Sequence, residues 1–168
     1  MSDTRPNVEL REVGPDDWEL FRLVRLRALE DAPDAFSTLL SEWQGDGDRE
    51  ERWRARLDGV PFNLIAVVDG RPVGQVSGTH VDDSGSVELI SMWVAPEARR
   101  TGIGRVLVEA VVMWAESSGA RAVTLAVKHG NSPAIALYER AGFIDQGVRP
   151  DASDERLMTR ALPTSAAP

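Results

Sequence analysis

The sequence predicts one α/β domain: a mixed, mostly antiparallel twisted sheet with about four helices. Three observations support this fold class. The chain has 168 residues, the size of one ordinary domain with a real core. Helix-spaced and strand-like segments alternate along it without an internal repeat or a linker. One stretch runs strand, glycine-rich loop, long helix, strand, which makes residues 86–94 and 121–127 a central parallel pair.

The N-terminal half is predicted to begin with a short strand over residues 7–13, which ends at a Gly-Pro turn signal. Residues 16–31 place apolar side chains at helical spacing behind an acidic first turn, which suits the helix dipole. Residues 32–60 predict a short helix or loop followed by a second helix. Their acidic run is expected to be a solvated face or a helix start, with attraction of cations as the alternative. Three strands follow, and the tight turns between them make them antiparallel neighbours: 62–68, 71–81 and 86–94.

The C-terminal half is predicted to begin with a long helix over residues 104–119. Most of its positions are apolar, so most of its circumference should be buried. Residues 121–127 predict a strand that is buried on both faces. Residues 132–142 predict a short helix with a serine at the N-cap and a glycine just past its end. Two strands are expected to close the chain, at 143–148 and 155–162.

Composition excludes several classes of function. The net charge of −8 argues against a protein that coats nucleic acid. The absence of cysteine excludes disulfides, thiolate metal sites and a cysteine nucleophile, and the two distant histidines argue against a metal centre. No charged-then-apolar leader opens the sequence and no apolar run approaches about 18 residues, so we expect a cytoplasmic protein without membrane contact. The domain is expected to span 1–162, with a disordered tail at 163–168.

The segment APEARRTGIGRVLVEA, residues 95–110, contains the main functional signal. Gly102 and Gly104 stand where a loop enters a helix, although glycine costs conformational entropy. The first amides of a helix have no internal partners and attract anions, and three arginines add positive charge there. A phosphate or pyrophosphate is therefore the expected ligand. The alternative is a glycine-rich turn that packs closely on a strand.

Two common phosphate-binding patterns fail at this loop. Walker A requires Lys-Ser/Thr after the second glycine, and Arg105-Val106 stand there instead. The dinucleotide fingerprint requires a third glycine, where Leu107 stands, and an acidic residue after the next strand, where Lys128 stands. A nucleotide-binding protein of another class is therefore disfavoured.

Arg99-x-x-Gly102-x-Gly104 resembles the pyrophosphate loop of the GNAT superfamily of acyl-CoA-dependent N-acetyltransferases. The stretch VELISMWVAPEARRTGIGRVLVEA resembles that family's fourth strand, loop and third helix, and NSPAIALYERAGF resembles its second signature. These motifs span about 86–144. The resemblance implies acetyl transfer from acetyl-CoA, without a metal, to a primary amine of a small molecule or peptide. Many members form homodimers, so it also allows a homodimer. The alternative is a non-catalytic acyl-CoA-binding or sensing module on the same fold.

The resemblance implies which residues hold acetyl-CoA. Loop amides would bind the pyrophosphate, and the pantetheine arm would lie along strand 86–94 like an added strand. A backbone amide at Met92 or Trp93 would face the thioester oxygen, and Asn131 would bind the pantetheine. The full set implied for the coenzyme is Met92, Trp93, Val94, Arg99, Arg100, Thr101, Gly102, Ile103, Gly104, Arg105, Asn131, Ala134 and Tyr138.

Acetyl transfer also requires a base for the amine and an acid for the thiolate. Glu88 is the only charged residue in strand 86–94, and a glutamate at the matching place serves several family members as the base. It is otherwise a solvated or ion-paired strand residue, and His80 and His129 are rival bases. Tyr138, the only tyrosine, matches the family's general acid and is otherwise a core aromatic. Two aromatic residues of the N-terminal helical region are weak candidates for acceptor contact, Phe36 and Trp43.

Overall fold

The computed structural model describes residues 7–36 and 38–163 and places seven strands in one sheet, in the order β1-β2-β3-β4-β5-β7-β6. The strands are β1 Val8–Glu12, β2 Phe62–Val68, β3 Arg71–Gly78, β4 Ser86–Val94, β5 Ala122–Lys128, β6 Ile144–Arg149 and β7 Ala152–Ala161. The helices are α1 Trp18–Asp31, α2 Glu50–Gly59, α3 Ile103–Ser117 and α4 Ser132–Arg140. Only β4 and β5 pair in parallel, so the predicted fold class is confirmed. Of the expected disordered tail, residues 164–168 lie outside the described residues.

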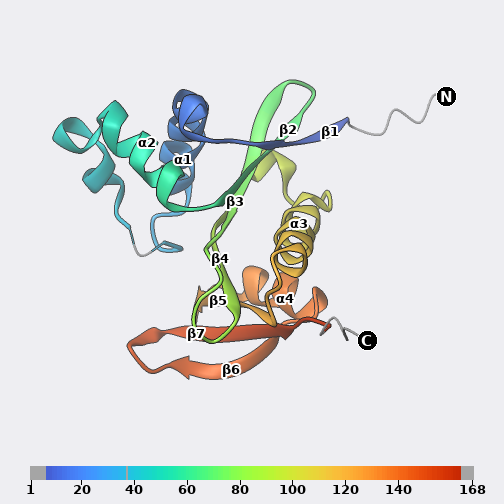
Figure 1. Ribbon diagram of the computed structural model, residues 1–168. Helices are drawn as coiled ribbons and strands as arrows, with labels where there is room; N and C mark the ends of the chain where they lie inside the picture. The colour runs from blue at the N-terminus through green and yellow to red at the C-terminus, as the bar shows by residue number, and fades with distance from the viewer. Residues whose placement is uncertain (1–6, 37, 164–168) are drawn as a thin grey trace.

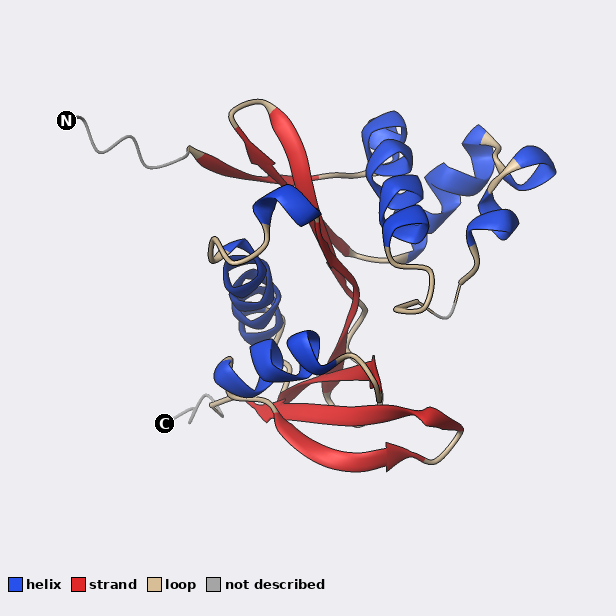
Figure 2. Ribbon diagram, turned by 180° about the vertical axis from the view of Figure 1, so that it is seen from behind, coloured by secondary structure: helices blue, strands red, loops and turns tan. Residues whose placement is uncertain are grey.

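Helices cover both faces of the N-terminal half of the sheet (Figure 1). α1 and α2 lie on one side of β2 and β3, and α3 lies on the other, with α4 beside it (Figure 2). β2 is buried along nearly its whole length because it receives side chains from both layers. One such contact is the stacked pair of Phe62 and Trp114, whose ring centroids are 4.9 Å apart. Within the described chain, no helix is long and apolar enough to cross a bilayer.

β4 and β5 separate soon after they meet. They pair in parallel only from Ser86 to Glu88, opposite Ala122 to Thr124. Beyond that point β4 stays with β3 up to Val94, while β5 stays with β7 up to Lys128. The register of β4 on β3 also shifts beside Ser91, whose φ of 58° marks a bulge. The two central strands therefore open a gap in the sheet.

Three sequence expectations differ from the structure. The strand predicted at 71–81 ends at Gly78. β7 begins at Ala152 and lies between β5 and β6, so most of the expected connecting loop extends the strand. The strand predicted at 121–127 is not buried on both faces: burial alternates along β5, and its more exposed face includes Ala126, which borders an open cavity.

Asp48 connects the elements of the helical layer. It belongs to the acidic run Asp46, Asp48, Glu50 and Glu51, which extends into the first turn of α2. Its carboxylate accepts hydrogen bonds from Arg22 Nε at 2.7 Å and from Trp53 Nε1 at 2.8 Å. Trp53 is fully buried and packs on Trp43 at a centroid distance of 4.4 Å. The bond from Arg22, followed by the bond from Trp53, lowers the pKa of Asp48 to about 2. Asp48 is thus a structural anchor rather than part of a solvated face.

Asp48 should make the fold sensitive to acid. A carboxyl pKa that is lower in the folded than in the unfolded state stabilises the fold above about pH 4, and this contribution is lost as pH falls toward 2. Asp48→Asn should therefore lower the free energy of unfolding by up to about 2 kcal/mol at pH 7, and by much less near pH 2. Urea unfolding across this pH range measures the difference. Asp46→Asn, an exposed neighbour, is the control. Parallel pH curves for wild type and Asp48→Asn would contradict the assignment.

Candidate functional site

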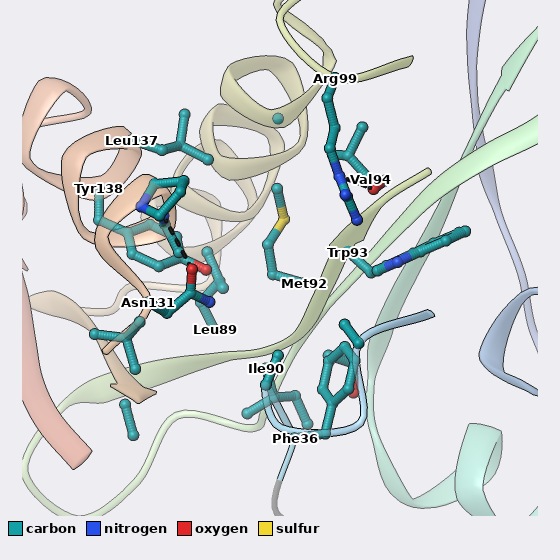
Figure 3. A pocket seen from close by; sticks show the side chains of 18 of the residues that line it. Phe36, Leu89, Ile90, Met92, Trp93, Val94, Arg99, Asn131, Leu137 and Tyr138 are labelled. Atoms are coloured by element: carbon teal, nitrogen blue, oxygen red, sulfur yellow. Dashed lines mark hydrogen bonds between the residues drawn. The ribbon is translucent and has the colours of Figure 1, made fainter. Parts of the chain in front are cut away.

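A cavity of about 1020 Å³ occupies the gap between β4 and β5. Its walls come from β4, β5, the loop before α3, α4 and the segment after α1. Figure 3 shows Met92 and Leu137 pointing into it, with Arg99 at one end of β4 and Phe36 beside Ile90 toward the other. The cavity is therefore elongated along β4.

The loop before α3 presents unpaired backbone amides to the cavity. Arg100 and Gly102 adopt left-handed backbone conformations, with φ of 63° and 90°. Among the described residues, no group accepts a hydrogen bond from the amides of residues 100–105. A Cβ on Gly102 would meet no protein atom within 4 Å, so the space beside it is open to a ligand. This arrangement of amides at a helix N-terminus is suited to bind a phosphate.

Gly104 stands where the first turn of α3 packs closely on its neighbours. A Cβ there would come within 3.1 Å of Leu137 Cδ2 and within 3.7 Å of Val94 Cγ2. The glycine therefore lets the first turn of α3 lie close to both α4 and β4. Close packing, offered above as the alternative to phosphate binding, thus applies to Gly104, whereas Gly102 faces open space.

The three arginines of the loop differ in their partners. Arg99 donates to the Val94 carbonyl at 3.1 Å and also to Asp31, so it anchors the loop to β4 and α1. The indole N–H of Trp93 and, after it, the Arg99 guanidinium lower the pKa of the Asp31 carboxyl. Arg105 pairs with Glu109 at 3.2 Å. Arg100 is exposed and forms no ion pair with a described residue, so its charge is available at the mouth of the cavity.

β4 has an open edge along the cavity. From Leu89 onward the β5 side of β4 has no strand partner, because the parallel pairing stops at Glu88. Met92, Trp93 and Val94 all line the cavity. Such an edge can hydrogen-bond an extended ligand as if it were another strand.

Glu88 lies where β4 and β5 separate. Its backbone N–H donates to Thr79 Oγ1 at 2.9 Å, and its carboxylate has no hydrogen-bond partner among the described side chains. The residue is half-buried and lines the cavity. His80 and His129 are exposed and do not line the cavity. The His129 Nδ1 atom lies 3.3 Å from Arg156 Nη1. Of the three predicted bases, only Glu88 borders the cavity.

Tyr138 reaches the cavity from α4 (Figure 3). Its ring is 6% exposed and packs edge-on against Phe143. Burial raises the pKa of the phenol above its usual value, so the hydroxyl stays protonated at neutral pH. The N-cap of α4 is Asn131 and not the predicted serine, because the Asn131 side chain accepts a hydrogen bond from the Ala134 amide at 3.4 Å. Asn131 and Ala134 both line the cavity.

A few predicted site residues do not border the cavity. Ile103 is buried under the loop, and Thr101 donates to the Ala98 carbonyl. Trp43 packs on Trp53, and the Arg52 guanidinium lies 3.7 Å from the centroid of the Trp43 ring, so Trp43 does not line the cavity. Phe36, the other candidate for acceptor contact, does line it.

Sequence reasoning also missed several cavity residues: Arg25, Arg56, Ser91, Arg149 and Glu155. Arg25 had a readable signal. It lies four residues after Phe21 and four before Leu29, on the apolar face of α1.

Comparisons with known proteins agree with this geometry. The model of the Acetyltransferase (GNAT) family matches residues 24–143. A mycothiol acetyltransferase of Pseudarthrobacter chlorophenolicus is 34% identical over 98 residues, which are 56% of this chain and 29% of that protein. The matched region thus spans under a third of that relative.

Two solved structures share the fold. One is PaiA N-acetyltransferase from Thermoplasma acidophilum in complex with coenzyme A, with a TM-score of 0.75, 17% identity, and coverage of 93% of this chain and 99% of that one. The other is YncA, a putative acetyltransferase from Salmonella typhimurium with its cofactor acetyl-CoA, with a TM-score of 0.75, 20% identity, and coverage of 96% and 98%.

Proposed function

Because the chain belongs to the GNAT acetyltransferase family, we propose that it transfers an acetyl group from acetyl-CoA to a primary amine by direct attack. The observation that carries the proposal is the run of amides at residues 100–105, which have no partner among the described residues; four of these residues line one end of a cavity whose wall is the open edge of β4: Arg100, Gly102, Gly104 and Arg105. The loop would hold the pyrophosphate, and the edge of β4 would pair with the amides of the pantetheine arm. Acetyl-CoA supplies the activated acyl group.

Two side chains of the cavity fit the proton transfers. The amine nitrogen forms a bond to the acetyl carbon as the carbon–sulfur bond breaks. The electron pair of the carbon–sulfur bond leaves with sulfur as the thiolate. Glu88, directly or through water, takes the proton that the amine must lose, and the protonated Tyr138 hydroxyl gives a proton to sulfur. The Met92 amide, on the open side of β4, would stabilise the carbonyl oxygen as charge develops on it, whereas the Trp93 amide faces β3, where Trp93 pairs with Gln75.

Coenzyme binding should depend on the empty space at Gly102. Gly102→Val places a branched side chain where φ is 90° and where the phosphate would lie. We expect it to weaken coenzyme A binding at least about tenfold in calorimetry at moderate ionic strength. Gly119→Val is a matched control, since Gly119 also has positive φ and open space but lies at the far end of α3. No binding heat with wild type, or equal weakening by both variants, would refute the loop as the pyrophosphate site.

Tyr138→Phe should lower kcat by about 10² or more while coenzyme affinity stays unchanged. Phenylalanine keeps the contact with Phe143 and removes only the hydroxyl. Steady-state kinetics together with calorimetry make the measurement. Equal turnover by variant and wild type would remove Tyr138 from the mechanism.

Glu88→Gln should lower kcat/KM on the order of 10² at neutral pH and recover partly at high pH, where unprotonated amine is abundant. Glu116→Gln, an exposed position on α3, is the control. A pH–rate profile that keeps the wild-type shape would argue against Glu88 as the base. Tight coenzyme binding without turnover of any amine would favour the sensing module instead.

A further inference from the structure

We propose that the acceptor is an amine that also carries a carboxylate, such as a free amino acid, and that Arg25 and Arg56 bind this carboxylate at the side of the cavity formed by α1 and α2. The inference rests on the proposed function and deepens it, because it names the class of acceptor.

Arg25 is a buried cation without an anionic partner among the described residues. It is 8% exposed, lines the cavity and lies under the Phe36 ring, 4.7 Å from its centroid. Its Nη1 is fully buried, and the guanidinium donates no hydrogen bond to any described residue. A buried guanidinium without acceptors is costly, and such groups in folded proteins normally find partners.

Arg56 lies near Arg25 and also has no carboxylate partner among the described residues. It donates to three neutral oxygens: Asn63 Oδ1 at 3.0 Å, Ser91 Oγ at 3.2 Å and Ser77 Oγ at 3.3 Å. Burial lowers the pKa of Arg56 to about 10, and burial together with the charge of Arg56 does the same to Arg25. The two cations therefore repel each other in a poorly solvated place.

Other arginines of the described chain show how different this pair is. Arg22 binds Asp48, Arg27 binds Glu97 at 2.7 Å, and Arg149 binds Glu155 at 3.1 Å. The chain has a net charge of −8, so carboxylates are plentiful. Arg25 and Arg56 nevertheless lack them, and they lie together at one cavity. An anion from outside the protein would offset both the desolvation and the repulsion.

The position of the pair relative to Glu88 points to an amine with an acidic group. Ser91, which accepts a hydrogen bond from Arg56, and Glu88 are three residues apart on β4, and the two residues and Arg56 line the same cavity. Glu88 would attract the ammonium group while the two arginines attract the carboxylate. A peptide N-terminus lacks that charge, because a neutral peptide group stands where the amino acid has its carboxylate.

Matched acceptors test this pairing of charges. Initial rates are compared for a panel of free amino acids and their primary amides, which differ only in the charge of the acidic group. Because the amide lowers the pKa of the amine, kcat/KM is expressed per concentration of unprotonated amine. We expect wild type to prefer the free acids by about 10- to 100-fold. Equal values for acids and amides would overturn the inference and leave the proposed acetyl transfer intact.

Variants test whether Arg25 produces the preference for free acids over amides. Arg25→Met keeps the apolar stem, and we expect it to reduce the acid-to-amide ratio toward 1 with little change for the amides, whereas Arg25→Lys should retain part of the ratio. Arg54→Gln removes an arginine of the same helix as Arg56 that pairs with Glu50 and Asp16 and does not line the cavity, so it should leave the ratio unchanged. Arg25→Met should melt at or above the wild-type temperature, since an unpaired buried charge is removed. A lower melting temperature with equal loss for acids and amides would show a structural role and refute the inference.

Binding measurements test the carboxylate site even if the protein does not transfer an acetyl group. If no amine is acetylated, calorimetry with coenzyme A present compares an N-acetyl amino acid with its amide. Tighter binding of the acid, lost in Arg25→Met, would support the carboxylate site even then. Indistinguishable binding of the two would reject it.

Discussion

The early end of the pairing between β4 and β5 is the constraint on which the site depends. Each strand keeps its other neighbour to its end, β4 with β3 and β5 with β7, so neither can follow the other past Glu88. Sheet twist, and the bulge at Ser91, carry β4 away from β5. A continuous parallel pair would have satisfied the edge of β4 internally and left no space. The cavity is thus a consequence of strand pairing.

The same separation explains why the groups of the site meet there. The connection from β4 to β5 passes through α3, so the free N-terminus of α3 lies beside the end of β4, at one end of the gap. α4 follows β5 directly and therefore brings Tyr138 and Asn131 to the opposite wall (Figure 3). Gly104 lets these helices approach each other, because any side chain there would press on Leu137. Backbone direction and the absence of a side chain at Gly104 together place the loop amides, the open edge of β4 and the Tyr138 phenol around one cavity.

Local patterns revealed the parts that depend on local chemistry. Turn residues and helical spacing were sufficient to predict most of the elements and the fold class, and the glycines at 102 and 104 marked a loop that borders the cavity. Relations between distant segments were not predictable in this way. The insertion of β7 between β5 and β6 depends on tertiary pairing, and so does the alternating burial of β5. Likewise, Asp48 looked like one member of an acidic run, because its partners Arg22 and Trp53 become neighbours only when α1 and α2 pack.

The arginines of the helical layer over β2 and β3 differ in whether they have a carboxylate partner. In one part of this layer, Arg22 and Asp48 form a pair that stabilises the fold with both charges satisfied. Arg25 lies about one helical turn from Arg22 on α1. It is buried and has no ion-pair partner among the described residues, and Arg56 donates hydrogen bonds to neutral oxygens. Helix packing alone could have used an apolar residue at position 25, since its neighbours at 21 and 29 are core side chains. A cation buried there costs stability unless an anion binds it, and both Arg25 and Glu88 line the same cavity, so the proposed acceptor would meet both charges.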